Sequence, residues 1–150
     1  MYAEGFAFSV FSTIASVLAE CGQVDRALDI ALEHLRPHGI GWTMENVAKA
    51  LLKAGGLSAS LELAEAMADD SPSKAKILAE ISVAYSEAGD TEQASQSLVM
   101  AIRVAGGGGH ECFYGAAREI VKALQHLHIA EDPTAIARAV LDAEKWLINS

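Results

Sequence analysis

The sequence predicts an all-α protein built as a stack of helical hairpins, and three observations lead to this class. Hydrophobic residues make up 51% of the 150 residues but aromatic residues only 6%, and the 28 alanines favour helices that approach closely. No segment alternates apolar and polar residues for long enough to form a strand. A glycine recurs regularly, at Gly22, Gly55 and Gly89. We therefore expect one domain over residues 1–150, with about eight antiparallel helices.

The recurring glycines mark the turns of the predicted hairpins. Their spacings are 33 and 34 residues, and a small residue follows each of them five positions later. Apolar residues with helical spacing lie on both sides of each glycine. Glycine ends the first helix of a pair by adopting the left-handed conformation that costs other residues energy, and a polar residue such as Asp90 or Thr91 caps the second. A period of this size is typical of stacked repeats, in which each unit buries its apolar face against the next.

The turn residues and the apolar spacing also predict the helix boundaries. The repeats lie near 8–40, 41–74 and 75–105. Their helices lie near 7–21 and 24–36, near 43–54 and 57–69, and near 74–88 and 91–105. Pro37, Gly39 and Gly41 break the chain after the first pair, and Asp70-Ser71-Pro72-Ser73 ends the second pair and caps the next helix.

The pattern changes after Ala105. Gly106–Gly109 is expected to form a linker of four glycines, followed by a longer helix near 111–128. Asp132-Pro133 then starts a last helix near 133–148, since proline is tolerated at the first helical position. We expect the segment 110–148 to be a diverged capping hairpin, because one face of a terminal unit has no further repeat to cover.

The third repeat resembles a tetratricopeptide repeat (TPR). Ile81-Ser82, Tyr85, Gly89-Asp90, Ala94 and Ala101 stand at that family's large-small pair, helix-A aromatic, turn and helix-B alanines. The second repeat is similar through Val47-Ala48, Gly55 and Pro72, and the first through Ile14-Ala15, Gly22 and Ala27. The resemblance covers roughly residues 8–105. It implies a right-handed superhelix whose first helices line a concave groove that binds a peptide or a helix, without chemistry of its own.

The resemblance places a set of side chains in this groove. They are Ser9, Ser12, Ser16, Trp42, Glu45, Lys49, Leu52, Lys53, Lys76, Ala79, Val83, Ser86, Glu87, Tyr114, Arg118 and, by extension, Lys122. Five of the 11 basic residues belong to this set, in a chain with 20 acidic residues and a net charge of −9. We predict a positive strip that binds an acidic protein segment or a chain-terminal carboxylate through Trp42, Glu45, Lys49, Lys53, Lys76, Val83, Tyr114 and Arg118. The alternative is that these lysines are ordinary solvated side chains.

Catalytic, metal and cofactor chemistry is not expected. Pro37 separates His34 from His38, and His110-Glu111 lacks the second histidine of a zinc-protease motif. The glycine run lacks the Gly-Lys-Ser/Thr ending of a phosphate loop. The negative charge argues against nucleic acid. We therefore expect no enzyme, no metal and no cofactor.

Localisation is predicted from the cysteines and the first residues. Cys21 and Cys112 form no metal or disulfide pattern, and the uncharged stretch 5–19 has no basic flank and is too short to span a bilayer. We expect a cytoplasmic protein that does not enter membranes. A second function class is structural: the end faces of the stack, near Phe6, Phe8 and Phe11 or near Trp146, Leu147 and Ile148, would mediate self-association into a homo-oligomer, or join this chain to a longer array.

Overall fold

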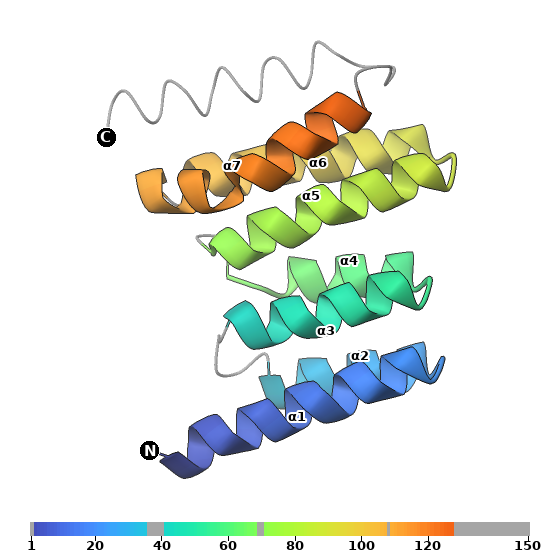
Figure 1. Cartoon of the computed structure of the whole chain (residues 1–150), viewed down its shortest axis with the longest axis vertical. Coiled ribbons are helices and arrows are strands. Elements are labelled where there is room, and N and C mark those ends of the chain that lie inside the picture. The colour runs from blue at the N-terminus through green and yellow to red at the C-terminus, as the bar shows by residue number, and fades with distance from the viewer. Residues whose placement is uncertain (1, 36–40, 69–70, 108, 128–150) are drawn as a thin grey trace. The chain divides into compact units, whose positions relative to one another are not determined.

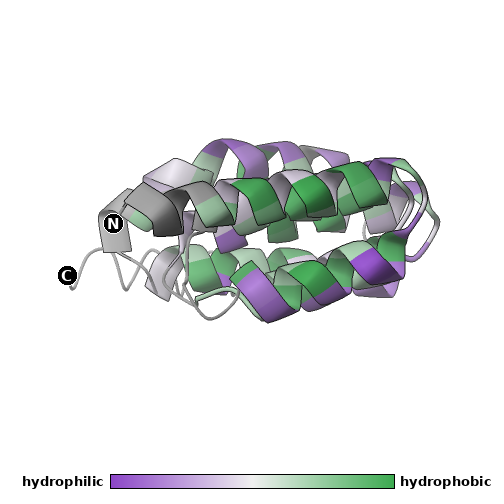
Figure 2. Ribbon diagram, turned by 90° about the horizontal axis from the view of Figure 1, so that it is seen from below, coloured by the Kyte–Doolittle hydropathy of each residue, from purple (hydrophilic) through white to green (hydrophobic). Residues whose placement is uncertain are grey.

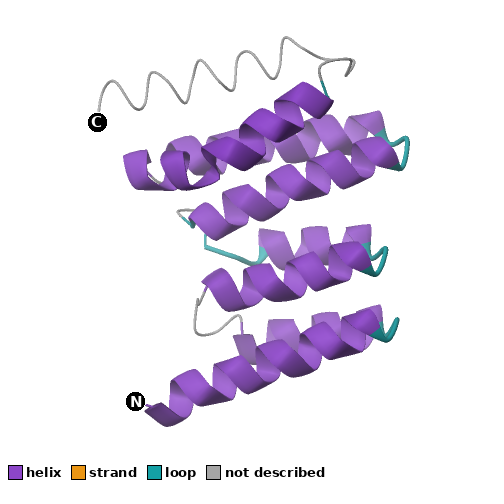
Figure 3. Ribbon diagram, in the orientation of Figure 1, coloured by secondary structure: helices purple, strands orange, loops and turns teal. Residues whose placement is uncertain are grey.

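The computed structural model describes residues 2–35, 41–68, 71–107 and 109–127. Helices and the turns between them make up these ranges, which contain no strand (Figure 3). The all-α prediction is confirmed for this part of the chain. The chain divides into two compact units, Met1–Ala68 and Asp69–Ser150, close to the predicted boundary between the second and third repeats. Figure 2 shows hydrophobic and hydrophilic residues on different faces of individual helices, as expected for helices that pack on one side.

The N-terminal unit holds two helical hairpins. They are α1 (Tyr2–Glu20) with α2 (Val24–Ile30), which continues as a π-helical turn η1 (Ala31–Leu35), and α3 (Gly41–Lys53) with α4 (Leu57–Glu65). Within this unit α1 packs against both α2 and α3, and α3 packs against α4 (Figure 1). The helix predicted near 24–36 is helical throughout its described residues, with α-helical geometry over Val24–Ile30 and π-helical geometry over Ala31–Leu35. A proline disfavours a regular α-helical turn in the residues just before it, and Pro37 follows this segment in the sequence.

The C-terminal unit holds α5 (Pro72–Glu87), α6 (Thr91–Gly107) and α7 (Gly109–His126), and each of these helices packs against the other two. The start of α5 confirms the predicted cap: the Ser71 hydroxyl accepts a bond from the Lys74 amide at 3.4 Å, and Pro72 occupies the first turn. Before α6, the Asp90 carboxylate accepts a bond from the Gln93 amide at 3.1 Å. Both helices therefore start at a side chain that satisfies an otherwise unpaired backbone N–H.

The three hairpin turns share one backbone geometry. Gly22, Gly55 and Gly89 have φ of 83°, 83° and 87°, in the left-handed region that other residues enter only at a cost. In each turn the glycine amide donates to the carbonyl three residues earlier, and the next amide donates to the carbonyl five residues earlier, at 2.8–3.1 Å. This is the Schellman arrangement, which satisfies the last carbonyls of the first helix. The predicted role of these glycines is confirmed.

The prediction that Gly106–Gly109 forms a linker is wrong. Gly106 and Gly107 are the last residues of α6, and Gly109 is the first residue of α7. Gly106 is buried, and the packing of α6 against α7 outweighs the intrinsic helix penalty of glycine, about 1 kcal/mol. The described residues hold seven α-helices and η1, and the predicted helix near 133–148 lies outside them. None of the helices in these ranges is long and apolar enough to cross a membrane.

One position of the repeat is fully buried in each of the first three hairpins. It lies seven residues before the turn glycine and holds Ala15, Ala48 and Ser82, all 0% exposed. The Ser82 hydroxyl finds no hydrogen-bond partner among the described residues. A buried hydroxyl without a partner carries a desolvation cost that alanine at the same position does not.

Ser82→Ala should therefore raise the free energy of unfolding by about 1 kcal/mol, measured by urea denaturation. Ser60→Ala is the matched control, because the buried Ser60 hydroxyl donates to the Ala48 carbonyl at 3.0 Å. That control should lose about 0.5–1 kcal/mol. A loss of stability in Ser82→Ala would contradict the assignment of an unpaired hydroxyl.

Candidate functional site

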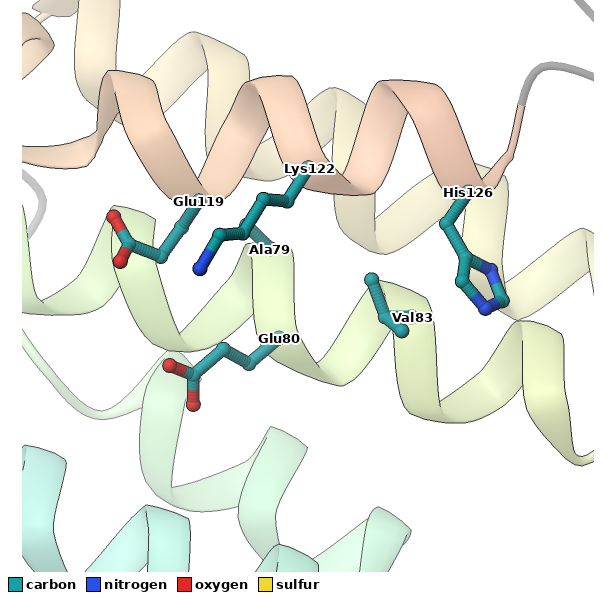
Figure 4. Close-up of a pocket in the computed structure, with 6 residues that line it drawn as sticks. All are labelled: Ala79, Glu80, Val83, Glu119, Lys122 and His126. Atoms are coloured by element: carbon teal, nitrogen blue, oxygen red, sulfur yellow. The ribbon is translucent and has the colours of Figure 1, made fainter.

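The C-terminal unit has a cleft between α5 and α7 of about 280 Å³. Ala79, Glu80 and Val83 line it from α5, and Glu119, Lys122 and His126 line it from α7 (Figure 4). These two helices are the predicted first helices of the third and fourth pairs. The cleft therefore lies between two of the helices that were predicted to line the binding groove.

Helical spacing brings these side chains together. Ala79 and Val83 stand one turn apart on α5, and the three residues of α7 have the spacing i, i+3 and i+7, which places them on one face. The adjoining face of α7 carries the small and apolar side chains that hold it on the core. These are Cys112, Ala116, Ile120, Ala123 and Leu127, each at most 5% exposed.

The helices α5 and α7 approach closely where the first turn of α5 meets the second turn of α7. A Cβ added at Gly115 would lie 3.2 Å from the Pro72 Cβ. The absence of a side chain at Gly115 therefore lets α7 come close to the start of α5. Ala79, which is 0% exposed, forms the apolar base of the cleft farther along α5.

The cleft carries charges of both signs. Glu80 and Glu119 contribute carboxylates, and Lys122 contributes an ammonium group whose nitrogen is directed into the space between the helices (Figure 4). At the other end, His126 Nε2 lies 3.6 Å from Glu87 Oε1, with 41% and 66% of these two side chains exposed. Exposure of this degree screens the pair, so it contributes little to stability. The arrangement offers an apolar base flanked by charged groups.

The predicted site residues of this unit separate into two groups. Val83 lines the cleft, and Lys76 lies one turn before Glu80 on the same helix. Tyr114 is 72% exposed and Arg118 is exposed, and neither belongs to the lining of the cleft. Among the predicted positions on α7, Tyr114 and Arg118 therefore lie outside the cleft, whereas Lys122 lines it.

Sequence reasoning missed Glu80, Glu119 and His126. Lys122 was expected only by extension of the repeat register, and it does line the cleft. The i, i+3, i+7 spacing of Glu119, Lys122 and His126 was a usable signal, because it defines one polar face beside the apolar one. The 33-residue register alone could not identify this face, since α7 has no equivalent of the turn glycines.

The predicted residues of the N-terminal unit lie on α3. Glu45 and Lys49 form an ion pair of 3.4 Å between Lys49 Nζ and Glu45 Oε1, one helical turn apart. Lys53 is exposed near the end of the helix, and the Trp42 side chain lies outside what the structure describes. Ser12, also expected in the groove, is buried, and its hydroxyl donates to the Thr43 carbonyl at 3.3 Å. Lys49 therefore has an acidic neighbour within its own helix, and Ser12 serves the contact between α1 and α3.

Within the described ranges, no group of three or more His, Cys, Asp or Glu side chains could hold a metal ion. No family model matches the sequence, and searches among curated proteins and among solved structures return no match.

Proposed function

We propose that this chain is a non-catalytic protein-interaction module of the TPR type that binds a protein segment along its first helices. The observation that carries the proposal is the cleft between α5 and α7, where Val83 and Lys122 line the same space. The shared geometry of the turns at Gly22, Gly55 and Gly89 supports a stacked repeat, the kind of scaffold that presents such surfaces.

The chemistry of the cleft indicates what kind of segment fits. Helix backbones have already paired their N–H and C=O groups, so recognition must come from side chains. An apolar side chain of the segment would lie over Ala79 and Val83, and an acidic one would face Lys122. Glu80 and Glu119 would disfavour a second acidic group nearby and so limit which acidic segments bind.

The test is selection of binders from a random peptide library displayed on phage, with the full chain as bait. Affinities of the selected peptides are then compared between Lys122→Glu and Arg118→Glu. The two changes reverse the same charge one turn apart on α7, but only Lys122 lines the cleft. We expect about a tenfold or larger loss for Lys122→Glu, since a close charge pair is replaced by repulsion, and less than about a twofold change for Arg118→Glu.

Two results would contradict the proposal. One is a library that yields no peptide bound by the chain. The other is an equal loss in both variants, which would show a general effect of charge rather than occupancy of the cleft.

A further inference from the structure

The first helix carries an exposed apolar stripe. Val10, Ile14 and Val17 on α1 are 38%, 42% and 49% exposed, which makes them three of the five exposed large hydrophobic side chains in the described ranges. With Ala7 before them and Cys21 after them, the spacing alternates between three and four residues. We call these five residues the α1 seam. The exposed Cys21 continues the helical register, because its amide donates to the Val17 carbonyl at 3.0 Å.

Spacing of this kind is the a/d pattern by which two helices pack along a narrow apolar line. The α1 seam contains no charged residue. Ile14 is the central residue of the seam: Ala7 and Val10 precede it, and Val17 and Cys21 follow it. A second helix laid along this line would bury the stripe.

The repeat itself indicates that a helix belongs on this face. The positions 33 residues after Val10, Ile14 and Val17 hold Thr43, Val47 and Ala50 on α3, and these are 0%, 0% and 8% exposed. In the same unit α3 packs against α1, with the Ser12 hydroxyl bonded to the Thr43 carbonyl. The equivalent face of α1 remains exposed.

The neighbouring helix α2 favours a single covering helix on this face over another stacked hairpin. Arg26 on α2 is exposed, whereas the equivalent residue on α4 is the buried Ala59. A hairpin stacked on both α1 and α2 would have to bury the Arg26 guanidinium at the place where the repeat holds alanine. The Arg26 guanidinium donates to the neutral Gln23 Oε1 at 2.9 Å, so its burial is strongly unfavourable unless the covering hairpin brings a carboxylate to it. A helix that covers α1 alone leaves Arg26 in solvent.

We infer that the α1 seam is a self-association surface, in which α1 packs against α1 of a second copy of this chain. A two-fold dimer uses the same patch on both partners, so it needs a surface that is complementary to itself, and an uncharged apolar seam meets this need. The two copies of α2, with their charged outer residues, lie at the periphery of such a pair. The interface is small, so we expect a dimer that dissociates on dilution. This surface belongs to the N-terminal unit and is independent of the proposed cleft.

Sedimentation velocity of the full chain over about a hundredfold concentration range tests the inference. The wild type should pass from a monomer of 15.8 kDa to a dimer of twice that mass. Ile14→Glu should stay monomeric, because pairing would bury its charge. Val121→Glu is the control: Val121 is 50% exposed on α7, so the same charge added there should leave the dimer intact. Far-UV circular dichroism checks that both variants keep their helix content.

A cross-link gives a second test that does not depend on a destabilising charge. Ile14→Cys in a Cys21→Ser background places a thiol at the middle of the seam, opposite its copy in a parallel pair and about one helical turn from it in an antiparallel pair, so a short bifunctional thiol cross-linker reaches the copy in both cases. Treatment with this cross-linker should convert it to a covalent dimer, and Val121→Cys in the same background should stay monomeric. A wild type that is monomeric throughout the range overturns the inference, as does equal cross-linking of the two cysteine variants. Binding of a different protein to a monomeric chain through Ile14 would likewise overturn it.

Discussion

Leu98→Ala should lower the free energy of unfolding by about 3 kcal/mol, the middle of the range for a buried leucine truncated to alanine. Leu98 lies on α6 and is 0% exposed. Its neighbours on the same face of the helix include Ala94 and Ala101, also 0% exposed, whose methyl groups cannot reach into the space that the leucine leaves. The cavity should therefore persist, and the cost should include both lost burial and lost contacts.

Urea denaturation followed by far-UV circular dichroism measures this loss. Val121→Ala is the control, because Val121 is 50% exposed on α7 and its truncation should cost less than about 0.5 kcal/mol. Similar losses in the two variants would contradict the burial of Leu98. In a chain whose core contains so many alanines, each large buried side chain contributes a large share of the apolar area.

The same substitution should have opposite effects at two glycines of the third hairpin. Gly89→Ala should lower the free energy of unfolding by about 1–2 kcal/mol, because an L-residue with a Cβ is strained at φ +87°. No atom lies within 4 Å of the added Cβ, so the loss would come from the backbone conformation alone.

Gly107→Ala should instead raise the free energy of unfolding by about 0.5 kcal/mol. Gly107 is helical, its φ is not positive, and its added Cβ also meets nothing within 4 Å. Thermal and urea unfolding of the two variants, compared with wild type, provide the measurement. A gain of stability in Gly89→Ala would contradict the left-handed conformation of that turn, and a loss in Gly107→Ala would contradict the helical, unobstructed position of Gly107.

The hairpins could be predicted because their signals are local. A left-handed turn accepts glycine far better than other residues, so Gly22, Gly55 and Gly89 could be assigned without any knowledge of packing. The cap at Ser71-Pro72 is local in the same sense, since its hydroxyl bonds an amide three residues away. The run Gly106–Gly109 misled the prediction because the packing of α6 on α7 opposes the local preference of glycine.

The cleft could be predicted only in part. Val83 was expected from its register on α5, but the rotation of α7 about its own axis decides that Lys122 and not Arg118 lines the cleft. That rotation follows from the burial of Ala116, Ile120 and Ala123 against the rest of the unit. The predicted basic strip did not take account of Glu119, which lies one turn before Lys122 on α7, or of Glu80, which only the fold brings to the same cleft from α5.

The sequence by itself determined where each hairpin turns and which face of each helix is apolar, since both depend on residues within a few positions of each other. Only the tertiary structure decided which apolar faces are covered. Ile14, Val47 and Ile81 occupy the same position of successive repeats, yet Ile14 is 42% exposed and the other two are fully buried. Burial is a property of the helix that packs on a residue, and that helix is specified by distant parts of the chain or, for Ile14, by the proposed second copy.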